Sequence, residues 1–185
     1  MAPATKDLHH GAVRALCFLS NEWLVSAGSD RQVFVLAMQD GSEVSKLDHS
    51  AARAQDKAMG TSSTHGLYGL ARSACGRFLA CSGRGLDRAI TIWDLSDPAK
   101  PRLFKVLHGH LRGTHFLAFS KDGEHLWSGS WDQTLALWNW QAETEQRQLV
   151  RPIPELSVAL MDPASERLFV GTAIGETYSL RLLEP

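Results

Sequence analysis

Histidine is the residue type in this sequence with the widest chemical scope, because it can bind metal ions or transfer protons near neutral pH. The chain has eight histidines, and the densest group is His108, His110, His115 and His125. A metal site would also require carboxylates or cysteines from separate loops, and neither H-E-x-x-H nor C-x-x-C occurs. We therefore expect His110 to be structural and the others to lie on surface loops or strands, and we predict no metal site.

Segment 83–88 (GRGLDR) begins like a glycine-rich dinucleotide-binding loop. It lacks the third glycine and the helix that would follow, so it predicts a turn. The chain has no P-loop and no G-x-S-x-G nucleophile motif. We therefore predict no catalytic residue and no cofactor, and we do not expect the protein to be an enzyme.

Charge, hydropathy and cysteine spacing indicate which partners the protein is expected to bind and in which compartment it is expected to work. Over 185 residues the formal net charge is −1, so no general attraction to nucleic acid or to an anionic membrane is expected. No apolar run reaches the ~18 residues of a membrane-spanning helix, and residues 1–8 lack the apolar core of a secretory signal. Cys17, Cys75 and Cys81 have no metal-type spacing, so we expect reduced thiols in a cytoplasmic or nuclear protein.

Segment 109–139 shows which elements must position these side chains. Residues 114–119 are apolar and rich in β-forming types, 121–123 (KDG) predict a hairpin turn, and 124–128 predict a second strand. A third strand is predicted at 134–138. Three short strands cannot bury both of their faces, so this segment is one unit of a larger assembly.

The same pattern recurs along the chain, with an aspartate six residues before an apolar strand end. The pairs are Asp132 with Trp138, Asp87 with Trp93 and Asp30 with Leu36, and segment 171–180 is a fourth, worn copy. We predict one domain of four units, at about 9–48, 65–107, 108–150 and 151–185. The polar insert at 48–64 predicts an extended loop, and it is either a partner-binding insert or a disordered connector.

Strands such as 89–93 (AITIW) and 135–138 (LALW) are apolar almost throughout. A sheet with one face in water would alternate between apolar and polar residues, so these sheets are expected to pack against neighbours on both faces. The sequence therefore predicts an all-β fold of β-propeller architecture, in which each unit forms one small antiparallel sheet, or blade.

Three dipeptides carry a family resemblance: Gly109-His110, Trp93-Asp94 and Trp138-Asn139. With these dipeptides at a period near 40–45 residues, the chain resembles the WD-repeat (tryptophan–aspartate repeat) family of β-propellers. In that family a histidine, a serine or threonine, an aspartate and a tryptophan form a buried hydrogen-bonded set in each blade. The resemblance implies a structural network of His9, Ser26, Asp30, Ser82, Asp87, Trp93, His110, Ser128, Asp132 and Trp138.

The units differ in how fully they keep this set. The third has all four members, the first has Leu36 in the tryptophan place, and the second has Ser63 in the histidine place. The fourth has no convincing member. A buried carboxylate must be paired, and a hydrogen bond to a charged group contributes ~1.5–3 kcal/mol, so we expect the third unit to be the most rigid.

The pattern predicts four strands in each of the first three units and three in the fourth. Closed propellers have ~4–8 blades, and members of this family most often have about seven. Residues 3–8 could supply the missing outer strand and close a four-bladed ring. We expect instead half of a ring, completed by a second copy, by another chain or by a part of the protein outside this sequence. Because an open half-ring would expose two apolar faces, we predict a dimer or an obligate partner.

The resemblance implies a non-enzymatic scaffold that binds other proteins. The candidate contact residues flank the His/Asp end of each unit without belonging to the network: His10, Ser29, Arg84, Leu86, Arg112 and Trp131. Trp131 leads, because a large aromatic residue in an exposed turn is typical of interface anchors. Packing of Trp131 against the neighbouring blade is an equal alternative.

A second hypothesis is an RNA-associated, non-catalytic subunit, because short stretches resemble WD-repeat subunits that act in large-ribosomal-subunit maturation and in tRNA guanine-N7 methylation. The arginines that could form a basic patch are at positions 72, 77, 84, 88, 102 and 112. The balanced net charge favours ordinary solvated turns, so we expect nucleic acid to be bound only indirectly or weakly, and no membrane to be bound.

Overall fold

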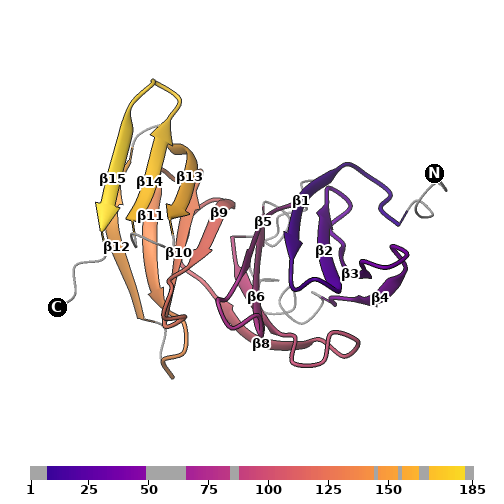
Figure 1. Ribbon diagram of the computed structural model, residues 1–185. Coiled ribbons are helices and arrows are strands. Elements are labelled where there is room, and N and C mark those ends of the chain that lie inside the picture. Colours follow the sequence, from indigo (N-terminus) through magenta and orange to yellow (C-terminus); the bar gives the residue numbers. More distant parts are fainter. Residues whose placement is uncertain are drawn as a thin grey trace.

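The computed structural model describes residues 8–48, 66–83, 88–143, 146–153, 156–162 and 167–181. Within these ranges the chain forms fifteen β-strands and no helix, arranged in four antiparallel sheets (Figure 1). Accordingly, no helix of the described residues could cross a membrane. The predictions for residues 3–7, the insert beyond Asp48, Ser63, Arg84, Leu86 and Asp87 lie outside the described residues.

Consecutive strands pair within each sheet. The first sheet contains β1 (Val13–Phe18), β2 (Trp23–Gly28), β3 (Val33–Ala37) and β4 (Glu43–Lys46). The second contains β5 (Leu67–Arg72), β6 (Phe78–Gly83), β7 (Ile90–Asp94) and β8 (Arg102–Leu107). The third contains β9 (Thr114–Phe119), β10 (His125–Ser130), β11 (Thr134–Asn139) and β12 (Gln146–Pro152). The fourth contains β13 (Leu156–Asp162), β14 (Arg167–Thr172) and β15 (Thr177–Arg181).

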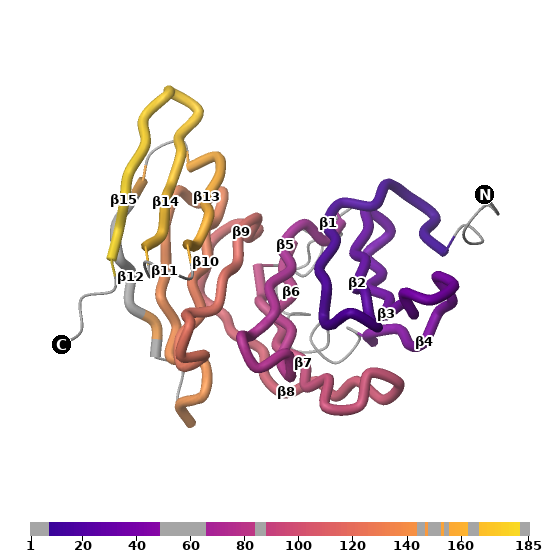
Figure 2. Tube along the Cα trace, viewed as in Figure 1, coloured from indigo at the N-terminus to yellow at the C-terminus, as the bar shows by residue number. Residues whose placement is uncertain are grey.

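The four sheets follow one another in chain order, from the indigo first sheet to the yellow fourth sheet (Figures 1 and 2). Their first strands lie side by side, since β1 contacts β5, β5 contacts β9 and β9 contacts β13. The first and fourth sheets lie at opposite ends of this row, so the described residues form an open arc of a propeller (Figure 2). The predicted all-β, β-propeller architecture is confirmed, as a partial ring.

Apolar side chains fill the three spaces between neighbouring sheets. Val25, Val35 and Leu79 belong to the core between the first and second sheets. The core between the second and third sheets is formed by larger residues that include Trp138, and the core between the third and fourth includes Trp127. The second and third sheets are thus covered on both faces, which explains why their strands are apolar almost throughout.

We call the first strand of each sheet its inner strand and the fourth its outer strand. Each inner strand carries a β-bulge near its start, at the same position in all four sheets. The pairing of β1, β5, β9 and β13 with its neighbour skips one residue. The skipped residues are Arg14, Tyr68, His115 and Ser157. A bulge leaves one residue without a cross-strand partner and re-aims its side chain, so these four side chains are freed from the alternation of the sheet.

The turn between the second and third strands also repeats in all four sheets. One or two residues before the third strand the backbone is left-handed, with φ of 67° at Arg31, 81° at Arg88, 69° at Gln133 and 87° at Gly175. Three of these four residues are not glycine, although the conformation is uncommon for residues with a Cβ atom. We call the end of the sheets that carries these turns the upper end, and the opposite end the lower end.

Candidate interaction face

The first sheet contains a linked histidine, aspartate and serine at its upper end. Nδ1 of His9 lies 3.0 Å from both carboxylate oxygens of Asp30, and Nε2 of His9 lies 2.9 Å from Oγ of Ser26. The backbone N–H groups of His10 and Gln32 donate to the same carboxylate at 3.0 and 3.1 Å. Burial would raise the pKa of Asp30, but the bond from His9 and these N–H groups outweigh it and hold the pKa below its usual value.

The third sheet contains the same arrangement in a fuller form. Nδ1 of His110 lies 3.1 Å from Oδ2 of Asp132 and 3.1 Å from Oγ1 of Thr134. Nε2 of His110 lies 2.7 Å from Oγ of Ser128, and Nε1 of Trp138 donates to the same oxygen at 2.7 Å. The tryptophan, serine, histidine and aspartate therefore form one continuous hydrogen-bonded chain.

The proton positions in this chain follow from its surroundings. Burial lowers the pKa of His110, although Asp132 acts in the opposite direction, so the imidazole is neutral near pH 7. Burial acts to raise the pKa of Asp132, but the hydroxyl of Thr134 and the N–H of Leu111 hold it below its usual value. A neutral His110 then donates from Nδ1 to Asp132 and accepts at Nε2 from Ser128, whose oxygen accepts from Trp138.

The second sheet departs from the predicted set. The strand pairing places Cys81 at the position that Ser26 and Ser128 occupy in their sheets, because it is Cys81 that pairs with Leu70 and Thr91. Ser82 is one residue further on, and its hydroxyl donates to the carbonyl of Thr114 in the third sheet at 3.2 Å. Nε1 of Trp93 donates instead to Thr91 at 3.1 Å. Ser82 therefore links two sheets and does not join Trp93 in one hydrogen-bonded set.

The fourth sheet carries apolar residues at the serine and tryptophan positions of this set. Val170 occupies the serine position, since it lies between Ala159 and Tyr178, and Leu180 occupies the tryptophan position. Val170 is buried and Leu180 packs against the third core. The fourth sheet is thus held by apolar contacts alone at these positions.

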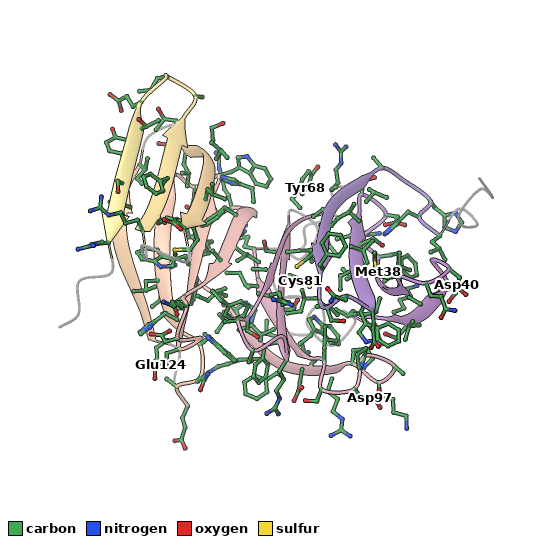
Figure 3. The ribbon with its side chains drawn as sticks, in the orientation of Figure 1. Met38, Asp40, Tyr68, Cys81, Asp97 and Glu124 are labelled. Carbon is green, nitrogen blue, oxygen red and sulfur yellow. The ribbon has the colours of Figure 1, made fainter. Side chains whose placement is uncertain are left out.

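Four residues from three sheets meet at the upper end, next to the inner strands. The indole of Trp131 makes an edge contact with Tyr68 at 5.5 Å between ring centroids, and lies 4.9 Å from the ring of His115. The guanidinium of Arg14 lies over the Tyr68 ring at 5.5 Å. Three of these residues are the bulge residues of their strands. Figure 3 shows Tyr68 projecting from this side of the molecule, where no sheet covers it.

His115 is the unusual member of this cluster. Both of its ring nitrogens are buried and lack a hydrogen-bond partner. Burial lowers the pKa of His115 to about 4, and the neighbouring His110 acts in the same direction. The ring is therefore neutral near pH 7, and it contributes to the cluster mainly as a flat surface against Trp131.

Three other predicted contact residues, His10, Ser29 and Arg112, lie at the same upper end, and Arg84 and Leu86 lie outside the described residues. His10 and Arg112 are exposed, and Ser29 is half-buried with its N–H bonded to the carbonyl of Ala12 at 2.8 Å. Trp131 is half-buried and packs on Tyr68 of the second sheet, as the alternative interpretation of this residue predicted. Sequence reasoning missed Arg14 and Tyr68, because the bulges that re-aim their side chains appear only in the strand pairing.

A family profile described as "WD domain, G-beta repeat" matches residues 57–94 and 101–139. The chain is a WD-repeat protein. It is similar in structure to the β-propeller domain of Myceliophteria thermophila Cps50 (Swd1), with a TM-score of 0.72 at 14% sequence identity. That similarity covers 95% of this chain and 53% of the other, and at this identity it supports the fold alone.

Three relatives are similar in sequence to this WD-repeat chain. Transducin-like enhancer protein 2 of Mus musculus is 35% identical over 112 residues, which is 60% of this chain and 13% of the relative. Nuclear distribution protein nudF of Emericella nidulans is 31% identical over 136 residues, or 66% and 28%. Protein groucho of Drosophila melanogaster is 33% identical over 112 residues, or 60% and 14%. The WD-repeat chain thus spans less than a third of the length of each of these relatives.

The arginines of the predicted basic patch are divided between the two ends of the WD-repeat sheets. Arg88 and Arg112 lie at the upper end, whereas Arg72, Arg77 and Arg102 lie at the lower end of the second sheet. Arg77 is bonded to Asp94, with Nη2 at 2.7 Å from Oδ2, and Arg72 donates to the carbonyl of Leu19. The described arginines therefore do not form one continuous basic surface.

One group of possible metal ligands occurs among the described residues, in the turn before β10. Ligand atoms of Asp122, Glu124 and His125 lie within 4.8 Å of one another. Asp122 is already engaged, since its Oδ1 accepts from the hydroxyl of Ser120 at 2.5 Å and from the N–H of Glu124 at 2.8 Å. Such bonds are typical of a tight turn, and they account for the position of the carboxylate without a metal ion.

Proposed function

We propose that this WD-repeat chain is a non-enzymatic scaffold that binds another protein at the upper end of its inner strands. The observation that carries the proposal is the cluster of Arg14, Tyr68, His115 and Trp131, which joins three sheets at one site. Aromatic residues and arginine are the types that contribute most to protein interfaces, especially when neighbouring contacts hold them in place before binding.

The rest of the upper end supports this choice of partner. Arg112 and His10 are exposed at the same upper end, whereas the carboxylates of Asp30 and Asp132 are occupied by hydrogen bonds within their sheets. The exposed side chains of this surface therefore include the cations Arg14 and Arg112 and the apolar Leu111. Such a surface suits a protein segment that combines apolar side chains with carboxylates.

The hydrogen bonds of the two histidines at the upper end also favour binding over catalysis. His9 and His110 each use both ring nitrogens within their own sheet. A general base needs a nitrogen directed toward its substrate, and these nitrogens are directed toward Ser26, Ser128 and the two carboxylates. This arrangement supports a structural role for both histidines.

Substitution of Trp131 by alanine tests the proposal. Trp131 makes two aromatic contacts at ~0.5–1.5 kcal/mol each, so Trp131→Ala is expected to lower the free energy of unfolding by about 1–3 kcal/mol and to abolish partner capture. Phe104→Ala is the matched control, because Phe104 also makes two aromatic contacts but lies on the outer strand β8.

Capture is measured by quantitative mass spectrometry of proteins retained by the immobilised wild-type chain and by each variant, at matched folded fractions. The proposal predicts that the Phe104 variant keeps the specific partners and that the Trp131 variant loses them. Equal retention by both variants, or equal losses that follow stability, would contradict it.

We also propose that further sheets complete the ring, supplied by a second copy, by another chain or by a part of the protein outside this sequence. We propose in addition that the protein works in the cytoplasm or the nucleus. The uncovered outer faces of the first and fourth sheets support the first statement, because Leu16 and Val158 are exposed there. The three cysteines are free thiols, which fits a reducing compartment.

A further inference from the structure

The outer face of the first sheet carries an apolar row that no described sheet covers, exposed at Phe18 and half-buried at Leu24 and Leu36. Phe18 pairs with Leu24, and Leu24 pairs with Leu36, so the three side chains stand in one line on the face turned away from the second sheet. Phe18 is 63% exposed, and Leu16 beside it is 62% exposed. We call this row, with Leu16, the leading face.

The outer face of the fourth sheet is a second uncovered row. Leu160 pairs with Phe169, and Phe169 pairs with Ser179, on the face turned away from the third sheet. Leu160 is 68% exposed, Val158 is 61% exposed and Phe169 is 45% exposed. We call this row, with Val158, the trailing face.

The leading face is equivalent, residue by residue, to a buried row in the third sheet. There Phe119 pairs with Leu126, and Leu126 pairs with Trp138, in the same register as Phe18, Leu24 and Leu36. All three residues of the third sheet are buried in the core against the second sheet. The position of Phe18 is thus one that another sheet covers elsewhere in the same molecule.

The trailing face is equivalent to the row on the other side of the third sheet. Ala118 pairs with Trp127, and Trp127 pairs with Leu137, in the register of Leu160, Phe169 and Ser179. Trp127 and Leu137 are buried in the core against the fourth sheet, and Ala118 packs on that core.

Every contact between sheets in this molecule joins a row of the trailing type to a row of the leading type. The first core joins Val25 and Val35 to Leu79 and Trp93, and the other two cores repeat this pairing. The two uncovered rows are therefore one of each type, and each lacks the kind of surface that the other offers. Two faces of the same type would not reproduce any contact seen in the fold.

Charges at the lower end of the two faces are of opposite sign. Arg167 and Arg181 are exposed and pair with each other on the trailing side of the fourth sheet, with Asp162 on the far side of Arg167. Glu43 is exposed and pairs with Leu36 on the leading face. Asp40 lies in the adjoining turn, at the end of the molecule away from the fourth sheet (Figure 3).

We propose that the leading face of one chain packs against the trailing face of a second copy of this chain. The inference rests on the ring completion proposed above and commits it to one occupant. Two copies offer two such contacts, so the pair closes on itself as a ring of eight sheets, within the ~4–8 blades of closed propellers. Each contact buries the two apolar rows and places Glu43 near Arg167 and Arg181.

The mass of the purified chain in solution is the first test, measured by light scattering after size exclusion. At tens of micromolar the wild-type chain is expected to have twice the single-chain mass of 20.4 kDa. Phe18→Glu and Leu160→Glu each place an unpaired carboxylate in both contacts, so each is expected to weaken dimerisation by at least ~100-fold and give the single-chain mass. Leu111→Glu is the matched control, since Leu111 is 73% exposed but lies at the upper end outside both faces.

Mixing the two monomeric variants tests the direction of packing. The Phe18→Glu chain keeps a wild-type trailing face and the Leu160→Glu chain keeps a wild-type leading face, so the mixture is expected to recover a dimer through one intact contact. Circular dichroism and thermal melting of each variant establish that it is folded. Recovery is specific to this packing, because contacts between two leading faces or two trailing faces would leave the mixture unchanged.

A wild-type chain that stays monomeric at these concentrations would overturn the inference. A mixture that stays monomeric, or a dimer that survives both single substitutions, would also overturn it. Trp131 lies outside both faces, so Trp131→Ala is expected to keep the dimer. Failure of the Trp131 capture test would therefore contradict the proposed binding site and leave this contact between copies untouched. A monomeric wild-type chain would contradict the contact and leave the binding site untouched.

Discussion

Substitution of Ser128 tests how much the complete hydrogen-bonded set of the third sheet contributes beyond the incomplete set of the first sheet. Its Oγ lies 2.7 Å from Nε2 of His110 and 2.7 Å from Nε1 of Trp138, and the residue is fully buried. Ser128→Ala removes one atom and leaves two buried nitrogens without a partner. An orphaned buried polar group costs ~1–3 kcal/mol, so the free energy of unfolding is expected to fall by about 3 kcal/mol.

Ser26→Ala is the matched control within the same chain. Ser26 is also buried and bonds to Nε2 of His9 at 2.9 Å, but Leu36 stands where the third sheet has Trp138. The same substitution therefore orphans one nitrogen instead of two. We expect a loss of about 1.5 kcal/mol, half of that for Ser128→Ala.

Urea unfolding followed by tryptophan fluorescence and circular dichroism measures both losses. The protein concentration must be the same throughout, because association would add to the apparent stability. For a domain of this size ~1 kcal/mol corresponds to ~2–4 °C in melting temperature, so the drops are expected near 6–12 °C for Ser128→Ala and 3–6 °C for Ser26→Ala.

Equal losses for the two serine variants would refute this reasoning, because they would show that the bond from Trp138 contributes nothing. A loss below about 0.5 kcal/mol for Ser128→Ala would refute it as well. Adding Trp138→Leu to both the wild type and Ser128→Ala gives a further check. The serine substitution should then cost about as much as Ser26→Ala does, since the third sheet would resemble the first.

Two other predictions concern cysteine reactivity and pH. The hydrogen bond from Ser73 lowers the pKa of the exposed Cys75 thiol, whereas burial raises the pKa of Cys17 and Cys81. A thiol reagent should therefore modify Cys75 first and Cys81 only on unfolding. A fast phase of thiol modification that persists in Cys75→Ser would contradict this. The pKa of His115 is about 4 in the folded chain, against an ordinary histidine value of 6.5, so its contribution to stability is complete above pH 6.5 and is lost as the pH falls toward 4. His115→Phe should therefore lose less stability than the wild type between pH 7.5 and 5 in urea unfolding, and an unchanged difference between the two would refute the assignment.

The strands themselves were predictable from local pattern. The predicted strand at 114–119 coincides with β9, and the expected outer strand of the second unit at 102–107 coincides with β8. Both are short apolar runs bounded by turn residues, which is the strongest strand signal in a single sequence. The arrangement of four sheets in an open arc also followed, because repeated units of this kind must pack on one another.

The register of the second sheet could not be predicted from the spacing of its serine and aspartate. Asp87 follows Ser82 by five positions, whereas Asp132 follows Ser128 by four. The aspartate and the tryptophan keep their spacing across the repeats, so the extra residue after Ser82 shows a longer turn but does not show which residue takes the serine position. Only the pairing of β6 with its neighbours places Cys81 at the serine position.

Only one part of the cluster at the upper end, Trp131, could be predicted from the sequence. Trp131 stood out as a large aromatic residue in a turn, but its contact with Tyr68 joins positions far apart in the chain. Local pattern also gives no signal for a bulge, since the residues that follow it in β5 and β9 are mostly apolar without alternation. The partners of Trp131 therefore depended on tertiary structure.

The repeated bulge has a consequence for how binding specificity can change. Positions 14, 68, 115 and 157 lack a cross-strand partner, so exchanging their side chains leaves the backbone pairing of every inner strand intact. The chain thus separates the residues that pair its strands from a set of four positions outside that pairing. A library varied at these four positions alone would sample new ligands on an unaltered framework, and related chains could diverge in what they bind by the same route.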